Sequence, residues 1–151
     1  MPLAAVAASF LLLLGLSLQA MALQERARSG AHERLRREED LLTTAAHLVV
    51  AALNGSHSCL LVLPLERWHA EEAACASPAV VETLTRLEVW SAPVQVLGWR
   101  PGADGGSAEL EVQLAAGEGR APRRGRFEVG LAGTPPQAVA LRLRNWGGAL
   151  P

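Results

Sequence analysis

The first 24 residues of the chain form an uncharged and largely apolar segment. No Asp, Glu, Lys or Arg precedes Glu25, and residues 3–18 are rich in Ala, Val and Leu. A helix over the whole segment would span ~36 Å, more than the ~30 Å hydrocarbon core of a bilayer. We therefore expect residues 1–24 to be a retained transmembrane helix. Cleavage after Ala22 as a secretory signal peptide is the alternative, because Ala20-Met21-Ala22 fits the small-x-small pattern.

The helical pattern continues through residues 25–54 as a charged, amphipathic stem. Leu35, Leu42 and Val49 recur every seven residues and mark one apolar stripe, which predicts a surface for assembly. A single helix over residues 3–53 would be on the order of 75 Å long. A chain of 151 residues is too small to cover such a helix, so lipid or other subunits should cover its first half.

The remainder, residues 55–151, is predicted to be an α+β globular head. Ser77-Pro78 is typical of a helix start, because Ser caps the first turn and Pro suits its first position. Four strand-like runs follow, separated by Gly- and Pro-rich turns, and these favour a four-stranded antiparallel sheet with one apolar face. The residues expected to face the N-terminal helix are Val94, Val96, Leu110, Val112, Leu114, Phe127, Val129, Leu131, Val139, Leu141 and Leu143.

Composition and charge exclude two broad classes. Half of the residues are apolar and 19% are charged, which excludes a disordered chain. The basic and acidic residues number 14 and 15, giving a net charge of −1. A chain so close to neutral has no overall field that would attract nucleic acid or an anionic membrane.

The order of these segments resembles the type IV pilins and pseudopilins, and the stem is especially similar to that of minor pilins. The matching residues are Met21, Leu23, Gln24, Glu25 and Arg26, followed by Ala45 and Ala46. The resemblance implies a structural subunit in the inner membrane with its head outside the cytoplasm. Its N-terminal helix would assemble into a type IV pilus or a type II secretion pseudopilus. A plain anchored or secreted periplasmic binding domain is the alternative.

The same resemblance implies partners but no chemistry. Other pilin or pseudopilin subunits would be the partners, with membrane lipid around the helix before assembly. No enzymatic activity, cofactor or small-molecule substrate is implied. The chain departs from the family at its start, since its first glycine, Gly15, lies inside the apolar run instead of ending a basic leader ahead of it. We expect either that the natural start lies upstream of Met1 or that the subunit is atypical.

The two cysteines, Cys59 and Cys75, are candidates for a disulfide. Closing a loop of ~15 residues would contribute about 3 kcal/mol in the chain-entropy model, and an even number of cysteines suits an exported head. Two buried thiols remain an alternative. A zinc site formed with His57 and His69 is another, although the order of the four residues matches no common zinc-finger spacing. Metal binding is therefore not predicted.

Catalytic and nucleic-acid signals are weak. The chain has no GxSxG, P-loop or HExxH motif, and a nucleophilic pair such as Cys59 with His57 lacks an orienting third residue. A basic cluster offers possible contacts with DNA phosphates, but we favour a solvated loop that keeps a sheet edge soluble. This cluster consists of Arg120, Arg123, Arg124 and Arg126.

Two further features are expected to be structural. Trp68, Trp90, Trp99 and Trp146 are predicted to pack in or beside the core, although together they offer an alternative aromatic binding face. Asn54-Gly55 should end the long helix. With Ser56 it forms a glycosylation sequon, relevant only in a host with that machinery.

Overall fold

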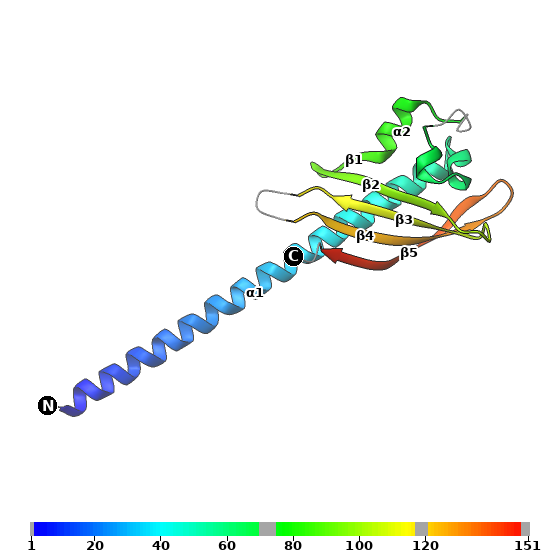
Figure 1. Cartoon of the computed structure of the whole chain (residues 1–151). Helices are drawn as coiled ribbons and strands as arrows, with labels where there is room; N and C mark the ends of the chain where they lie inside the picture. The colour runs from blue at the N-terminus through cyan, green and yellow to red at the C-terminus, as the bar shows by residue number, and fades with distance from the viewer. Residues whose placement is uncertain (1, 70–74, 117–120, 149–151) are drawn as a thin grey trace. The chain divides into compact units, whose positions relative to one another are not determined.

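The computed structural model describes residues 2–69, 75–116 and 121–148, with side chains described for 15–69, 75–116 and 121–144. Its helices are α1 (Pro2–Asn54), the 3-10 helices η1 (Ser58–Val62) and η2 (Leu65–Arg67), and α2 (Pro78–Thr85). Its strands are β1 (Arg86–Val89), β2 (Ala92–Pro101), β3 (Ser107–Leu114), β4 (Arg123–Ala132) and β5 (Gln137–Gly148), as Figure 1 shows. The predicted α+β class, with a long N-terminal helix and an antiparallel sheet, is confirmed.

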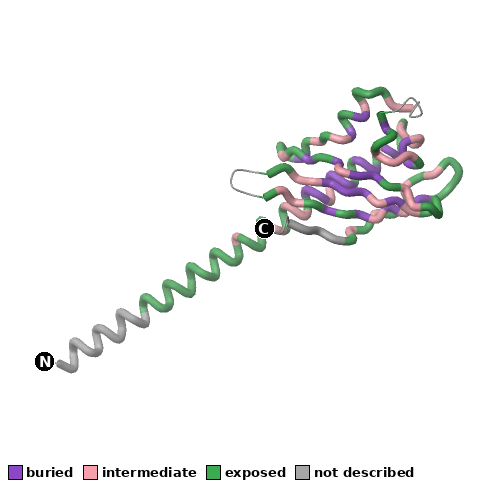
Figure 2. The backbone as a smooth tube through the Cα atoms, viewed as in Figure 1, coloured by how far each residue is buried: buried purple, intermediate pink, exposed green. Residues whose placement is uncertain are grey.

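Contacts divide the chain into two compact units, residues 1–37 and residues 38–151. The first unit is helical from Pro2 onward, and every residue from Gly15 to Ser29 is exposed (Figure 2). No helix within the described residues is long and apolar enough to cross a membrane. Most of the predicted apolar run, residues 3–14, lies outside the described side chains.

The second unit is built around a five-stranded antiparallel meander in the order β1-β2-β3-β4-β5. The prediction of four strands is therefore wrong by one. The first strand-like run, within residues 87–99, was expected to form a single strand. Instead the chain turns back at Trp90 and Ser91, so that Val89 pairs with Ala92. Both turn residues have positive φ, 48° and 64°. Such two-residue turns normally carry Asn or Gly, and the sequence offers neither here, so the hairpin left no turn signal.

The part of α1 that belongs to the second unit supplies the helical side of its core. Leu42, Ala45, Ala46, Val49 and Leu53 are at most 1% exposed. They follow the i, i+3, i+4 spacing of an amphipathic helix, which places them on one face. Helix and sheet approach each other at Gly125 of β4, where an added Cβ would lie 3.6 Å from the Cβ of Leu42.

Most of the predicted inward-facing strand residues are buried, and β5 contains the exception. The buried ones are Val94, Val96, Leu110, Val112, Phe127, Val129 and Leu131. Leu114, Leu141 and Leu143 are partly buried and pack against the core. Val139, in contrast, is 65% exposed. A register shift between Gly130 and Leu131 leaves Val139 opposite no residue of β4, and this bulge reverses the alternation that the sequence implied.

The short helix α2 begins as predicted. Ser77 precedes Pro78, and its hydroxyl accepts a hydrogen bond from the amide of Val80 at 3.4 Å. Val81 and Leu84 are buried, three residues apart, and face the core. The helix ends at Thr85 and the chain passes directly into β1, so α2 fixes where the edge of the sheet starts.

Candidate functional site

The exposed apolar residues of α1 are the main candidate for an interaction surface. Leu16, Leu18, Met21 and Leu23 are 62–68% exposed. At 100° per residue, Leu16 and Leu23 share one face of the helix, whereas Leu18 and Met21 lie on the opposite face. We call these four residues the apolar stem surface. A helix that is apolar on opposite faces is typical of one enclosed on all sides, by lipid or by several other helices.

The three residues of the heptad stripe proposed for assembly, Leu35, Leu42 and Val49, do not all lie in the same unit or have the same burial. Leu42 and Val49 are 1% and 0% exposed and lie in the core of the second unit. Leu35 belongs to the first unit and is half-buried. Sequence periodicity alone cannot separate burial within a subunit from burial between subunits, because both need the same apolar stripe. Of the three, only Leu35 lies in the same unit as the apolar stem surface.

The basic cluster is part of a strand and not of a loop. Arg123, Arg124 and Arg126 lie in β4, and Arg120 lies outside the described residues. Alternation along the strand separates their side chains. Arg123 forms an ion pair with Glu38 of α1, with 3.2 Å between Nε and Oε2. This pair joins helix and strand at the start of the second unit.

Arg124 and Arg126 lie on the outward face of the sheet, where a carboxylate balances them. Glu111 of β3 is only 7% exposed, and its oxygens lie 3.9 and 3.8 Å from Arg124 and Arg126. Arg124 also donates from Nε to Oε1 of Gln113 at 2.9 Å. Because each described arginine of the cluster has an acidic neighbour, the cluster offers less positive charge to a phosphate than its sequence implied.

The rest of the outward face continues this alternation of charge across the strands. Arg100 and Glu109 are 3.5 Å apart, and so are Arg144 and Glu128. These pairs are largely exposed and contribute little to stability. They make a mixed-charge, solvated surface. Arg142 and Arg144 of β5 are exposed as well.

Cys59 and Cys75 form the predicted disulfide, with their Cα atoms 6.1 Å apart. The ring nitrogen Nδ1 of His57 lies 3.1 Å from the carbonyl oxygen of Cys75 and holds the same loop. Because both sulfurs are bonded to each other, neither is available as a thiolate ligand or nucleophile. The disulfide therefore excludes the Cys2His2 zinc site and the Cys–His nucleophile in this oxidised form.

The C-terminal residue of α1 makes contacts that the sequence did not indicate. Asn54 donates from Nδ2 to the carbonyl oxygen of Ala138 at 2.8 Å and accepts the Ala138 amide at Oδ1 at 2.6 Å. The side-chain amide of Asn54 thus makes the two backbone hydrogen bonds that a neighbouring strand would make at the edge of β5. Attaching a glycan to Nδ2 would disturb this pairing, so the sequon residue already has a structural role.

The tryptophans divide into two groups. Trp68 and Trp99 are buried, 6.3 Å apart between ring centroids, and their indole NH groups donate to the carbonyl oxygens of Leu63 and Leu61. The prediction of core packing is confirmed for these two. Trp90 is 68% exposed, so for this residue the prediction is wrong. The side chain of Trp146 lies outside the described part of the chain.

Comparisons with known proteins leave the family of this chain open. No protein-family model matches the chain, and searches of curated proteins and of solved structures found no match either. The resemblance to pilins therefore rests on the residues of the stem and on the α+β architecture, and it stays a prediction.

Proposed function

We propose that the protein is a minor pilin-like or pseudopilin-like structural subunit that sits in the inner membrane and assembles through its N-terminal helix. The observation that carries the proposal is the apolar stem surface. Large apolar side chains project from opposite faces of one helix and are about two-thirds exposed. Exposed apolar clusters of this kind mark sites of protein or membrane interaction.

The free energies favour burial of more than these four residues. Fully burying a Leu or Met side chain contributes about 1.5–3 kcal/mol, so the exposed parts of the apolar stem surface are worth on the order of 4–8 kcal/mol. Association costs roughly 4–15 kcal/mol in lost freedom of motion. The four side chains alone fall within that range. The proposal therefore also uses the apolar residues 3–14, which precede them in the sequence.

The connection between stem and head supports a role in display. α1 is one helix from Pro2 to Asn54, and its last part is packed in the core of the second unit. The helix that carries the apolar stem surface therefore also contributes to the core of the head. This arrangement suits a subunit that displays its head from an assembly.

The proposal can be tested with charge substitutions on the stem. The doubly substituted chain Leu16→Arg/Leu23→Arg would be expressed in the protein's own host and compared with Gln24→Arg, which adds a charge in the same region at a polar position. We expect the double variant to disappear from the membrane and sheared-filament fractions. Gln24→Arg should stay in them, and both should keep the disulfide.

Two results would count against the proposal. One is that Leu16→Arg/Leu23→Arg fractionates like the unsubstituted chain. The other is that the unsubstituted chain occurs neither in membranes nor in sheared filaments. The second result would favour the alternative of a secreted periplasmic binding domain.

A further inference from the structure

The hairpin between β1 and β2 presents an aromatic side chain that packing does not explain. Trp90 is 68% exposed, whereas the other aromatic side chains that the structure describes, Trp68, Trp99 and Phe127, are at most 1% exposed. A large exposed aromatic residue is unfavourable in water unless a partner covers it, and Trp is among the residues most enriched in binding hot spots.

The backbone at this residue is strained as well. Trp90 and Ser91 both adopt left-handed conformations, with φ of 48° and 64°. This region is unfavourable for residues with a Cβ and especially for bulky ones, and hairpin turns of this kind usually place Gly or Asn there. Backbone strain of this kind tends to persist at functional sites, where it holds a side chain in the position that its function requires. Folding alone would favour glycine at Trp90.

A groove lies beside the hairpin on the outward face of the sheet. Its volume is about 560 Å³, and its lining includes Arg86, Glu88, Pro93, Gln95, Gln113 and Ala115. Glu88 of β1 pairs with Pro93 of β2. The next pair along the two strands, Val89 and Ala92, directly flanks the turn. The volume falls within the usual range for small-ligand sites, and the groove is partly open to solvent.

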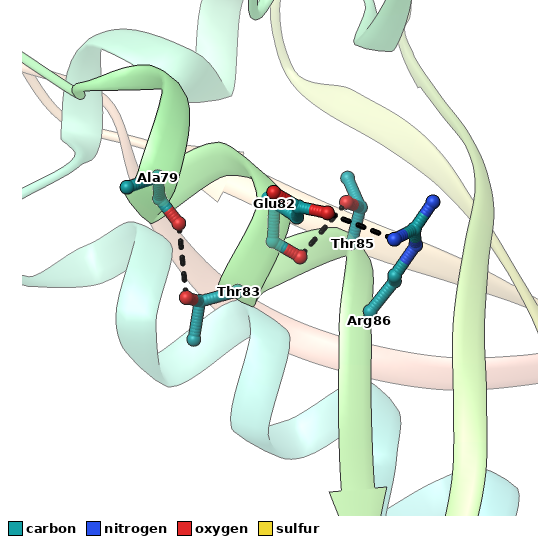
Figure 3. A network of polar contacts seen from close by, with 5 residues as sticks. All are labelled: Ala79, Glu82, Thr83, Thr85 and Arg86. Carbon is teal, nitrogen blue, oxygen red and sulfur yellow. Dashed lines mark hydrogen bonds and ion pairs between the residues drawn. The ribbon is translucent and has the colours of Figure 1, made fainter.

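The polar groups of the groove are held in place by neighbours. Arg86 lies 2.8 Å from the carboxylate of Glu82, and Thr85 donates to the backbone carbonyl of the same residue at 3.1 Å (Figure 3). On the other side, Oε1 of Gln113 accepts from Arg124 at 2.9 Å, which leaves its amide NH2 as the group that can donate. The groove thus offers a guanidinium and a side-chain amide, each with a hydrogen-bonded neighbour.

We infer that the Trp90 hairpin and this groove form a binding site for a neutral polysaccharide. The flat indole ring matches the apolar face of a pyranose ring, and the guanidinium, carboxylate and amide groups match its hydroxyls. Charge selects against acidic ligands, because the one guanidinium of the groove, Arg86, is paired with the carboxylate of Glu82, and a second carboxylate, Glu88, also lines the groove. Because the groove is partly open to solvent, it also leaves room for a polymer to extend beyond it.

The test is calorimetric titration of the full-length protein with cellohexaose, maltohexaose and chitohexaose. A detergent without a sugar headgroup is required, because a sugar headgroup would compete. We expect at least one oligosaccharide to bind and Trp90→Ala to weaken its binding about tenfold or more. Gln95→Ala should weaken it less. Val139→Ala, which changes another exposed apolar residue on a different strand, should leave binding unchanged.

Two glycine variants separate a binding role from a folding role. Trp90→Gly should raise Tm, because it relieves the left-handed strain, and should abolish binding. Ser91→Gly should also raise Tm but keep binding. The inference is overturned if none of the three oligosaccharides binds at millimolar concentration or if Trp90→Gly binds normally. It is also overturned if Trp90→Gly lowers Tm, or if that variant loses only filament assembly, which would make the hairpin a protein contact. Only this last result refers to the proposed assembly role, and the binding and Tm results do not depend on it.

Discussion

Gly125→Ala should destabilise the protein, because the added Cβ would overlap the buried ring of Phe127, two residues along β4. A Cβ at this position would meet Cε2 of Phe127 at 2.9 Å and Cζ at 3.4 Å, with the Cβ of Leu42 at 3.6 Å. The Phe127 ring is 1% exposed and Leu42 is also 1% exposed, so neither can move aside into solvent. Overpacking of this kind costs about 1–3 kcal/mol.

A second glycine provides the matched control. Gly98 is also buried in a central strand, but an added Cβ there would lie 3.7 Å from the Cβ of Glu111, an ordinary contact. Replacing Gly by Ala inside a strand is otherwise favourable by roughly 0.5–1 kcal/mol. Gly98→Ala should therefore be neutral or slightly stabilising, and the two variants should differ by about 1.5–4 kcal/mol, the sum of the two effects.

The assay is urea unfolding followed by tryptophan fluorescence, in which a shift of the midpoint at constant slope reports a change in stability. Adding Phe127→Leu to Gly125→Ala should recover part of the loss, because it removes the two ring atoms nearest the new methyl group. The coupling between the two changes should be about 1–2 kcal/mol. If Gly125→Ala proves as stable as Gly98→Ala, then the buried ring of Phe127 does not lie against Gly125 as described.

Three further changes probe the second unit. Asn54→Ala should lower the free energy of unfolding by about 1–3 kcal/mol, because it removes two hydrogen bonds to the edge of β5; chemical denaturation would measure it. Cys59→Ser, or reduction of the unsubstituted protein, should cost about 3 kcal/mol, and an unchanged Tm after complete reduction would contradict this. Arg123→Ala should cost on the order of 1–2 kcal/mol, because it removes the ion pair with Glu38, whose side chain is 14% exposed. Arg86→Ala, at an exposed pair, should cost below about 0.5 kcal/mol and serves as its control.

Most of the fold follows from local patterns in the sequence. The strand alternation in β3 and β4 placed Leu110, Val112, Phe127 and Val129 in the core, where they are buried. The Ser-Pro pair located the start of α2 within the chain. These predictions succeed because each depends on the period of a single element and on contacts close in sequence.

The failures share a different cause. The hairpin at Trp90 uses a turn conformation that its residues do not favour, and Val139 is turned outward by a bulge that no residue type announces. The roles of Leu42 and Arg123 depend on contacts between α1 and β4, which are far apart in sequence. Long-range packing decides such positions, and a local pattern carries no information about it.

The candidate surfaces were predicted only in part. The disulfide followed from cysteine count and spacing, and it is present. The apolar stem surface lies in the part of the helix that we predicted to be covered by lipid or other subunits. Two of the three residues of the heptad stripe predicted for assembly, Leu42 and Val49, are instead buried in the core of the second unit. The outward face was expected to carry charges, but the burial of Glu111 beneath two arginines was missed, because strand alternation assigns it simply to the solvent side.

The central claim is that the N-terminal helix is retained and anchors the protein in a membrane or filament. The most direct test is the N-terminal sequence of the mature protein from its own host, determined separately for membrane, sheared-filament and soluble fractions. The proposal predicts an N-terminus at or before Leu3, found in the membrane or sheared-filament fraction. An N-terminus at Leu23 in the soluble periplasmic fraction would contradict it and would leave the head as a secreted domain.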